Sequence, residues 1–329
     1  MRDWLRLLRI SGLVTILSNL AAAGTSALYA DGALDPAWLA QRLLSGEPWW
    51  ILLSSCCLYL SGMIWNDIVD AGRDRELHPE RPLPSGRIGL APAAVVGTLL
   101  TAAALACAAQ VRFGLPLAGL VLALSFFYNL VAKPVPILGS VTMAAVRGAH
   151  AVFALLALGP DLLAVTVTSG SLSAGGHWRI PPHALLLAGW IFAVTWISEM
   201  ESRSAQRWEL LAAGGVLAVV VTLALARLAT ASWIPRLWLE GDFGPPLAVL
   251  AVVTVVGLAA ALAAAVLPAW ATAVASGQRA DAGRTVGAGL GGMILLDALI
   301  AGAAQPLIGA LIAILYPIHR IMARLARMD

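Results

Sequence analysis

The chain has 329 residues, of which 60% are hydrophobic and 12% are charged, and its formal net charge is +3. Soluble domains carry about 25% charged residues, so a mean hydropathy of +0.85 excludes a soluble globular enzyme and a disordered chain. The small net charge also excludes a nucleic-acid-binding protein, because it provides no basic surface that could neutralise phosphates. We therefore expect an integral membrane protein with the lipid bilayer as its surroundings.

Continuous apolar runs predict nine transmembrane helices, which we assign to a single domain over 1–329. A span needs roughly 20 apolar residues, and these runs are rich in alanine and leucine without the alternation of a β-barrel strand. The last run is long for one span and contains Pro306, so we expect it to be tilted, kinked or broken. The expected helices lie near 11–30, 47–66, 90–111, 114–131, 136–158, 183–200, 209–228, 246–275 and 286–317.

The distribution of arginines favours a cytoplasmic N-terminus, because cytoplasmic loops of membrane proteins carry an excess of basic residues. The C-terminus does not fit this orientation. With nine spans, Arg320, Arg324 and Arg327 would lie on the outer side, so either the final segment re-enters or the tail is an exception. The basic loops that the rule assigns to the cytoplasm are 67–89, 132–135, 201–208 and 276–285.

An acidic cluster ends the second predicted helix. Asp67, Asp70 and Asp74 are spaced i, i+3 and i+7, and Asn66 begins an i, i+4, i+8 row with Asp70 and Asp74. Carboxylates on one helical face repel one another unless cations bind there. Rows of hard oxygen ligands suit Mg²⁺, which bridges protein carboxylates to substrate phosphates. The alternative is a solvated helix end that is neutralised by Arg73 and Arg75.

Two motifs together resemble the UbiA superfamily of intramembrane prenyltransferases. The first is Asn66-Asp67-x-x-Asp70-x-x-x-Asp74, which is followed by Arg81-Pro82-Leu83-Pro84-Ser85-Gly86. The second is Tyr128-Asn129-x-x-x-Lys133-x-x-Pro136-x-x-Gly139 after the fourth predicted helix. The resemblance implies an all-α membrane protein with about nine helices around a central cavity, and transfer of a prenyl group from a prenyl diphosphate to a small acceptor.

The resemblance also implies roles for the motif residues. Asn66, Asp70 and Asp74 would hold Mg²⁺ on the diphosphate, and Asp67 would support them. Lys133 is the chain's single lysine and would contact the diphosphate directly, although a helix-end lysine can also extend toward the membrane interface without a catalytic role. Further residues that we assign to substrate binding are Arg81, Tyr128 and Asn129.

The sequence departs from the family at the second acidic motif, where Asp-x-x-x-Asp is expected on the sixth helix. It offers Glu199 and Glu201, which lie about 200° apart around a regular helix, so one glutamate or none would reach a metal. The alternative is an ordinary helix end in which a glutamate pairs with Arg203 or Arg207. This altered motif resembles the divergent EboC-like branch encoded in bacterial gene clusters, which implies a polyol or cyclitol acceptor and a bacterial inner membrane. The distribution of arginines adds a cytoplasmic active site.

Several polar residues lie within the apolar runs, where charges usually face a cavity or a partner. Arg147 is expected either to contact the diphosphate or to pair with an acidic motif residue. Asn19 is expected either to bind substrate in the cavity or to link helices. Asp297 is either functional, part of a structural pair with an arginine, or a protonated, hydrogen-bonded carboxyl. His150 lies one turn from Arg147.

Three other functions remain open from the sequence. A UbiA-type terpene cyclase would capture the prenyl cation within the same molecule. A secondary transporter is a different class, but no matched pair of broken helices is recognisable. A non-catalytic prenyl-lipid-binding protein is compatible with the altered second motif.

Overall fold

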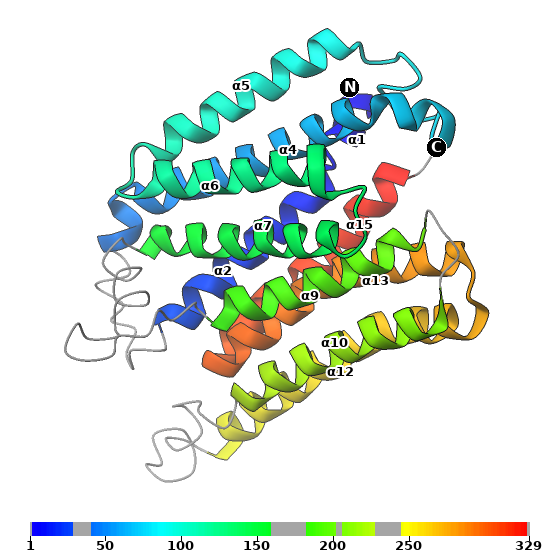
Figure 1. The fold of residues 1–329 in the computed structure, drawn as a ribbon. Helices are drawn as coiled ribbons and strands as arrows, with labels where there is room; N and C mark the ends of the chain where they lie inside the picture. Colours follow the sequence, from blue (N-terminus) through cyan, green and yellow to red (C-terminus); the bar gives the residue numbers. More distant parts are fainter. Residues whose placement is uncertain (1, 29–40, 159–181, 202–205, 228–244, 328–329) are drawn as a thin grey trace, which may run out of the picture.

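The computed structural model describes residues 2–28, 41–158, 182–201, 206–227 and 245–327, and all regular elements in these ranges are helical. The helices lie side by side as an elongated bundle (Figure 1). The main helices are α2 (Leu13–Leu28), α4 (Glu47–Leu77), α5 (Leu90–Ala108), α6 (Gly114–Phe127), α7 (Leu138–Ala154), α9 (Pro182–Glu199), α10 (Arg207–Ala226), α12 (Pro245–Ser276), α13 (Arg279–Ala304), α14 (Pro306–Ala313) and α15 (Leu315–Arg327). The short elements are α1 (Arg2–Leu7), η1 (Ile10–Gly12), η2 (Tyr128–Ala132) and η3 (Leu155–Leu158).

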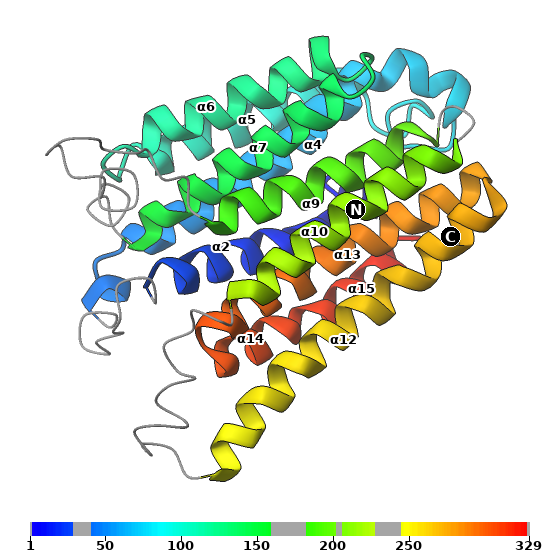
Figure 2. The ribbon, with the colours of Figure 1, turned by 60° about the horizontal axis from the view of Figure 1, so that its bottom comes forward.

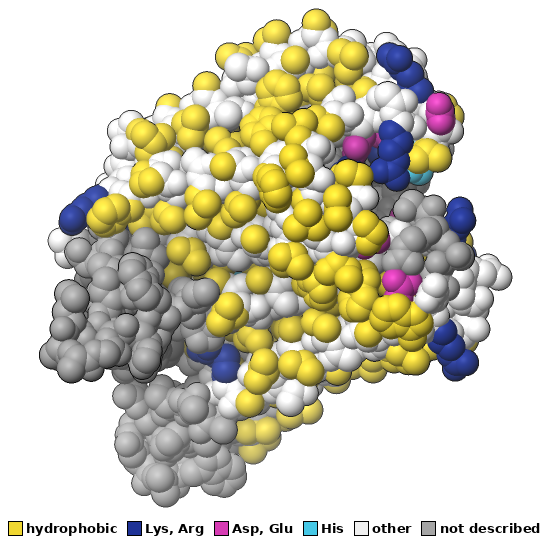
Figure 3. Space-filling model, in the orientation of Figure 1, with side chains coloured by type: hydrophobic (Ala, Val, Ile, Leu, Met, Phe, Trp, Pro, Cys, Tyr) yellow, Lys and Arg dark blue, Asp and Glu magenta, His cyan; other side chains and the backbone are white. Residues whose placement is uncertain are grey.

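The described part of the chain is built to lie in a membrane. It contains 8 helical stretches that are long and apolar enough to cross a bilayer, and two shorter apolar ones, Ile10–Ser26 and His183–Glu199. Hydrophobic side chains cover most of the face in Figure 3, and charged ones gather at the end where α4 finishes. The predicted all-α integral membrane fold is confirmed, and the expected count of nine spans is approximate.

The last predicted run, 286–317, is two antiparallel helical segments. The chain breaks at Gln305, whose side chain caps α14, and Pro306 opens α14. Gly302 lies against Gly309 and Gly291 lies against Tyr316 and His319, so α14 and α15 return along α13. The C-terminal arginines therefore lie at the end of the bundle that holds the N-terminus, and α15 contacts α1. This return removes the conflict that nine spans created for the C-terminus.

Helix α13 is the central helix of the bundle, and nearly every residue from Gly289 to Ala303 is buried. It packs against α2, α9, α12 and α14 (Figure 2). Small residues permit this crowding. A Cβ atom at Gly292 would lie 2.7 Å from Val266 Cγ2 and 3.2 Å from Trp190. Close approach through small residues is a general feature of helix packing in membranes.

Asp297 of α13 joins three helices. Its carboxylate accepts hydrogen bonds from Ser18 Oγ at 2.7 Å and from Asn19 Nδ2. His183 Nε2 of α9 lies 2.9 Å from the other carboxylate oxygen. All four side chains are buried. The structure therefore pairs Asp297 with a histidine rather than an arginine, and the Asn19 contact supports the helix-linking alternative.

We expect Asp297→Ala to destabilise the protein, because it leaves buried donors of Ser18 and Asn19 without an acceptor. The cost should be roughly 1–3 kcal/mol, measured as a lower Tm in detergent. Glu76→Ala, at an exposed carboxylate, is the control and should leave Tm unchanged. An equal Tm for Asp297→Ala and the wild type would show that this cluster does not stabilise the bundle.

Candidate active site at the end of α4

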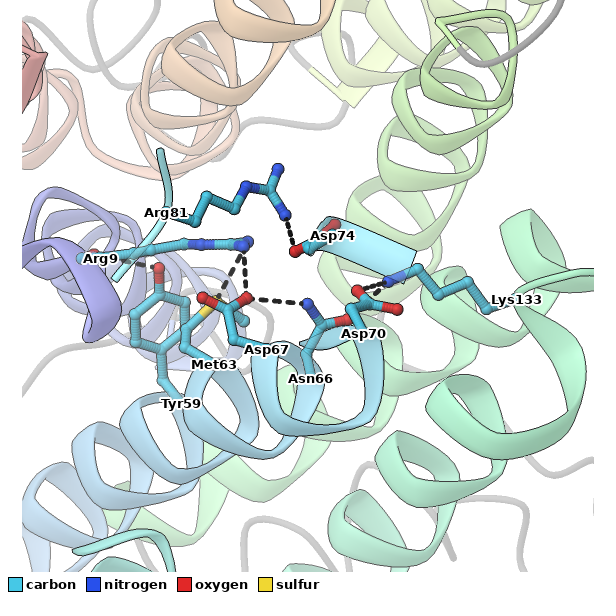
Figure 4. A network of polar contacts seen from close by, with 9 residues as sticks. All are labelled: Arg9, Tyr59, Met63, Asn66, Asp67, Asp70, Asp74, Arg81 and Lys133. Carbon is cyan, nitrogen blue, oxygen red and sulfur yellow. Dashed lines mark hydrogen bonds and ion pairs between the residues drawn. The ribbon is translucent and has the colours of Figure 1, made fainter. Parts of the chain in front are cut away.

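Helix α4 is long enough to place its last turns beyond the bilayer core. Its 31 residues span about 46 Å, compared with about 30 Å of hydrocarbon. Asn66, Asp67, Asp70 and Asp74 lie on these last turns (Figure 4). Asp67 and Asp74 are buried although they are charged. Buried carboxylates need partners. Each of the three carboxylates of this helix end, Asp67, Asp70 and Asp74, has a basic partner.

Three basic side chains from different segments neutralise the cluster. Arg9, which precedes η1, places a guanidinium nitrogen 2.8 Å from Asp67. Lys133 pairs with Asp70, and Arg81 Nη1 lies 2.6 Å from Asp74. The ion pairs of the acidic cluster thus come from residues outside α4, and not from the neighbouring Arg73 and Arg75 of the same helix.

A folded loop after α4 positions Arg81. Ile88 N donates to Pro82 O at 3.1 Å, and Gly86 N donates to Leu83 O at 3.1 Å. Gly86 has φ of 74°, a conformation that residues with a Cβ rarely adopt. Leu83 and Ile88 are buried in a small apolar cluster with Ile64 of α4. The loop therefore folds back on α4 and directs Arg81 to Asp74.

A π-helical turn positions Lys133. The segment Tyr128–Ala132 is π-helical, and Lys133 N donates to Tyr128 O at 2.9 Å. Such turns are often found at functional sites because they change the direction of side chains. Lys133 Nζ donates to Asn66 Oδ1 at 2.9 Å as well as to Asp70. Lys133 therefore has two partners in the acidic cluster and does not extend toward the membrane interface alone.

The side-chain oxygens of Asn66 and Asp70 are suitable ligands for a hard cation. The Asn66 and Asp70 oxygens converge on the Lys133 ammonium, so they already share one cationic centre. Amide and carboxylate oxygens are the ligands that Mg²⁺ accepts. Among the described residues, no three His, Cys, Asp or Glu side chains converge closely enough to hold a metal. Of the residues that the resemblance implied as metal ligands, Asn66 and Asp70 share the Lys133 ammonium, and Asp74 pairs with Arg81.

Glu199 is the last residue of α9, and its carboxylate lies against the N-terminus of α7. Ser140 Oγ donates to its carboxylate at 2.6 Å, and Ile137 N donates to it at 3.3 Å. Ile137 has φ of 65°, which is an outlier for a β-branched residue. The short segment 133–137 thus presents Lys133 at its start and a bound Glu199 at its end. Backbone strain of this kind is often found at functional sites.

Glu201 does not join Glu199. Its carboxyl lies against α13, where a Cβ at Gly283 would be 3.5 Å from Glu201 Cδ. Partial burial raises the pKa of Glu201, and the nearby cations His78 and Arg81 oppose that rise. The two carboxylates therefore contact different helices, Glu199 on α7 and Glu201 on α13, and Glu201 lies beyond the end of α9. Arg203, one proposed partner of these glutamates, lies outside the described residues.

Asn66 lines a largely apolar cavity. Its volume is about 90 Å³. Tyr128 and Asn129 line it near Asn66, and Arg147 and His150 line it along α7. Apolar side chains of α2, α4, α6 and α7 form the rest of its wall: Ile16, Leu58, Met63, Val121, Met143 and Val146.

Arg147 forms no ion pair with an acidic motif residue within the described part of the chain. Its guanidinium lies 5.7 Å from the centre of the Tyr59 ring, and no carboxylate pairs with it. Asn19 lies with Asp297 and is absent from the cavity wall. Sequence reasoning missed the contacts of Arg9 and Ser140. The basic N-terminus signalled Arg9, but nothing in the sequence indicated that Ser140 meets Glu199.

These features define a class: a helical membrane protein with a paired acidic and basic cluster above an apolar cavity. A family model described as the UbiA prenyltransferase family matches residues 19–286. The chain therefore belongs to the UbiA prenyltransferase family and is a membrane-embedded enzyme of the prenyltransferase class. A search of curated proteins found no match to it.

Two solved structures share the fold. A structure of digeranylgeranylglyceryl phosphate synthase is 17% identical, covers 92% of this chain and 97% of its own, and superposes with a TM-score of 0.51. A UbiA homologue from Aeropyrum pernix K1 is 19% identical, covers 91% of this chain and 96% of its own, and gives a TM-score of 0.50. At these identities the likeness concerns the fold.

We expect the Glu201 carboxyl to titrate above the usual range for glutamate, because partial burial disfavours its charged form. Infrared titration of the protonated carboxyl band checks this, with Glu201→Gln used to assign the band. His78→Ala should move the midpoint still higher, because a cation is lost. A midpoint below that of an exposed glutamate would contradict the packing of Glu201 against α13.

Proposed function

We propose that this enzyme transfers a prenyl group from a prenyl diphosphate to a small acceptor in a Mg²⁺-dependent reaction at the cytoplasmic membrane face. The observation that carries the proposal is the junction of two environments. Charged groups that suit a diphosphate and its metal gather around the last turns of α4, and Asn66, within that cluster, also lines the apolar cavity. A prenyl diphosphate has the same division between a charged head and an apolar chain.

In the proposed complex, Asn66, Asp70 and Asp74 hold Mg²⁺, and Asp67 supports them through its pair with Arg9. Lys133 and Arg81 then turn from the carboxylates to the diphosphate oxygens. Bound Mg²⁺ supplies Lewis-acid stabilisation of the pyrophosphate charge. Glu199 is the second-motif residue placed to act, since Ser140 and Ile137 N fix its carboxylate beside the Lys133 segment.

The proposed step breaks the bond between the allylic C1 carbon and the diphosphate oxygen. Lys133 and Arg81 stabilise the charge that develops on the leaving pyrophosphate, as preorganised cations do in other active sites. The acceptor nucleophile forms the new bond to C1 and releases its proton to pyrophosphate. Tyr128 lines the cavity, and its ring can stabilise the allylic cation.

The acceptor and the membrane orientation are parts of the same proposal. The resemblance to the EboC-like branch supports a polyol or cyclitol acceptor and a bacterial inner membrane. The arginines of α15 lie at the same end of the bundle as the basic residues around α4, which supports a cytoplasmic site under the positive-inside rule. Mass spectrometry of products distinguishes prenyl transfer from terpene cyclisation, because only transfer adds an acceptor.

We expect Asp70→Asn and Asp74→Asn to lower turnover roughly 10²–10³-fold, the usual loss when one group that stabilises a transition-state charge is removed. Pyrophosphate release from purified protein in the presence of a cellular extract of small molecules is the measurement. Glu76→Gln is the matched control, since Glu76 is an exposed carboxylate on the same helix end. Full turnover in either aspartate variant would refute the site assignment.

We also expect prenyl diphosphate binding to require Mg²⁺, because Asp70 and Asp74 would otherwise repel the anionic head. Calorimetry before and after chelation with EDTA measures this dependence, and restored binding after Mg²⁺ is added back controls for damage to the protein. Equal affinity with and without the metal would rule out the proposed role of Mg²⁺.

A further inference from the structure

The turn that joins Lys133 to α7 is strained. Leu138 N donates to Pro136 O at 2.7 Å, which closes a three-residue turn around Ile137. Ile137 has φ of 65° and ψ of −42°, the signs of the γ-turn form that is rare and strained in proteins. Its β-branched side chain makes these angles costlier. A residue held in this way persists only where surrounding contacts stabilise it.

Glu199 supplies contacts that hold this turn. Its Oε2 accepts a hydrogen bond from Ile137 N at 3.3 Å, and its Oε1 accepts one from Ser140 Oγ at 2.6 Å. The Ile137 side chain is 51% exposed, so packing of that side chain does little to hold the turn. Hydrogen bonds to a charged group are among the stronger ones in proteins. One carboxylate of α9 thus stabilises both the strained residue and the first turn of α7.

The strained turn is coupled to Lys133 by close packing. A Cβ atom at Gly139 would lie 3.3 Å from Ala132 O and 3.4 Å from Lys133 Cα. Gly139 N also donates to Val135 O at 3.1 Å. The two prolines of the segment 133–137 fix two of its φ angles. A change at the turn therefore moves the backbone of Lys133.

The position of Lys133 matters because its ammonium group donates to Asn66 and Asp70 at once. Small displacements of a group that contacts substrate are costly for catalysis. Among the described residues, Glu199 forms no cluster of three metal-binding side chains with the carboxylates of α4. The route from Glu199 to the acidic cluster thus runs through the turn and the lysine.

We infer that Glu199 is a positioning residue that acts through Lys133: it holds the strained turn at Ile137, and the turn keeps the lysine beside Asp70. The effect on catalysis rests on the proposed function, in which Lys133 contacts the diphosphate. Control of the lysine by a distant carboxylate does not depend on the substrate. Glu199 thus acts on the 133–137 segment, and metal binding is left to the residues of α4.

The reactivity of the Lys133 amine tests this inference directly. Lys133 is the chain's single lysine, so acylation with a succinimidyl ester, followed by peptide mass spectrometry of the purified full-length protein, reports on one side chain. We expect Glu199→Ala to be acylated at Lys133 roughly ten-fold faster than the wild type, because loss of hydrogen bonds to a charged group makes local opening more frequent. Glu199→Gln should restore most of the protection, because its amide oxygen still accepts a hydrogen bond.

A second substitution distinguishes positioning from metal binding. Glycine adopts positive φ without strain, so Glu199→Ala combined with Ile137→Gly should be acylated within about three-fold of the wild-type rate. Glycine at this position could not replace a lost metal ligand. Ser198→Ala is the matched control, because the Ser198 hydroxyl donates to Thr195 O within α9, and its rate should equal that of the wild type.

Calorimetry of a prenyl diphosphate with Mg²⁺ gives a second measurement. Its Kd should rise in Glu199→Ala and recover in the double variant, in the same order as the acylation rates. Gel filtration verifies that each variant is folded. If Glu199→Ala aggregates, Ser140→Ala, which removes the 2.6 Å bond, provides the same test with an increase of about three-fold in acylation.

Three results would overturn the inference: acylation of Glu199→Ala at the wild-type rate, acylation of Glu199→Gln as fast as that of Glu199→Ala, or no slowing of acylation when Ile137→Gly is added to Glu199→Ala. Failure of the proposed function has a different signature, namely a wild-type protein that binds no prenyl diphosphate with Mg²⁺. The acylation rates would be the same in that case, because they are measured without substrate.

Discussion

Neutralisation of three carboxylates at one helix end is the constraint on which this structure depends. Carboxylates three or four residues apart on a helix repel one another, and two of those on α4 are buried. The cluster is stable only with cations, and these come from Arg9, Arg81 and Lys133. Meeting this requirement draws the N-terminal segment, the loop after α4 and the π-helical turn after α6 to one point.

Because the charged groups gather at one helix end, the site has a charged part and an apolar part. Above Asn66 the protein is a network of paired charges, and below it the cavity is mostly apolar with one polar side on α7. Helix α7 serves both parts, because its N-terminus holds Glu199 and its interior carries Arg147. A small change in the position of α7 therefore alters the charged site and the cavity together.

Sequence patterns correctly predicted features that depend on neighbouring residues, such as helix faces and helix breaks. Helical spacing placed Asp70 and Asp74 on one face, and Pro306 marked the point where the last apolar run breaks. The partners were harder to predict, because Arg9 and Asp67 are separated by 58 positions and periodicity says nothing about which helices meet. Asp297 illustrates this limit: its burial was predictable, but its bonds to two other helices required the packed bundle.

The return of α14 and α15 along α13 has a consequence for neighbouring polypeptide. Because α15 contacts α1, both ends of the described chain emerge beside the charged site (Figure 1). A domain joined to either end would thus lie on the same side of the membrane as the charged cluster of α4. A water-soluble enzyme tethered there would deliver its product at high local concentration, with no need for that product to cross the bilayer.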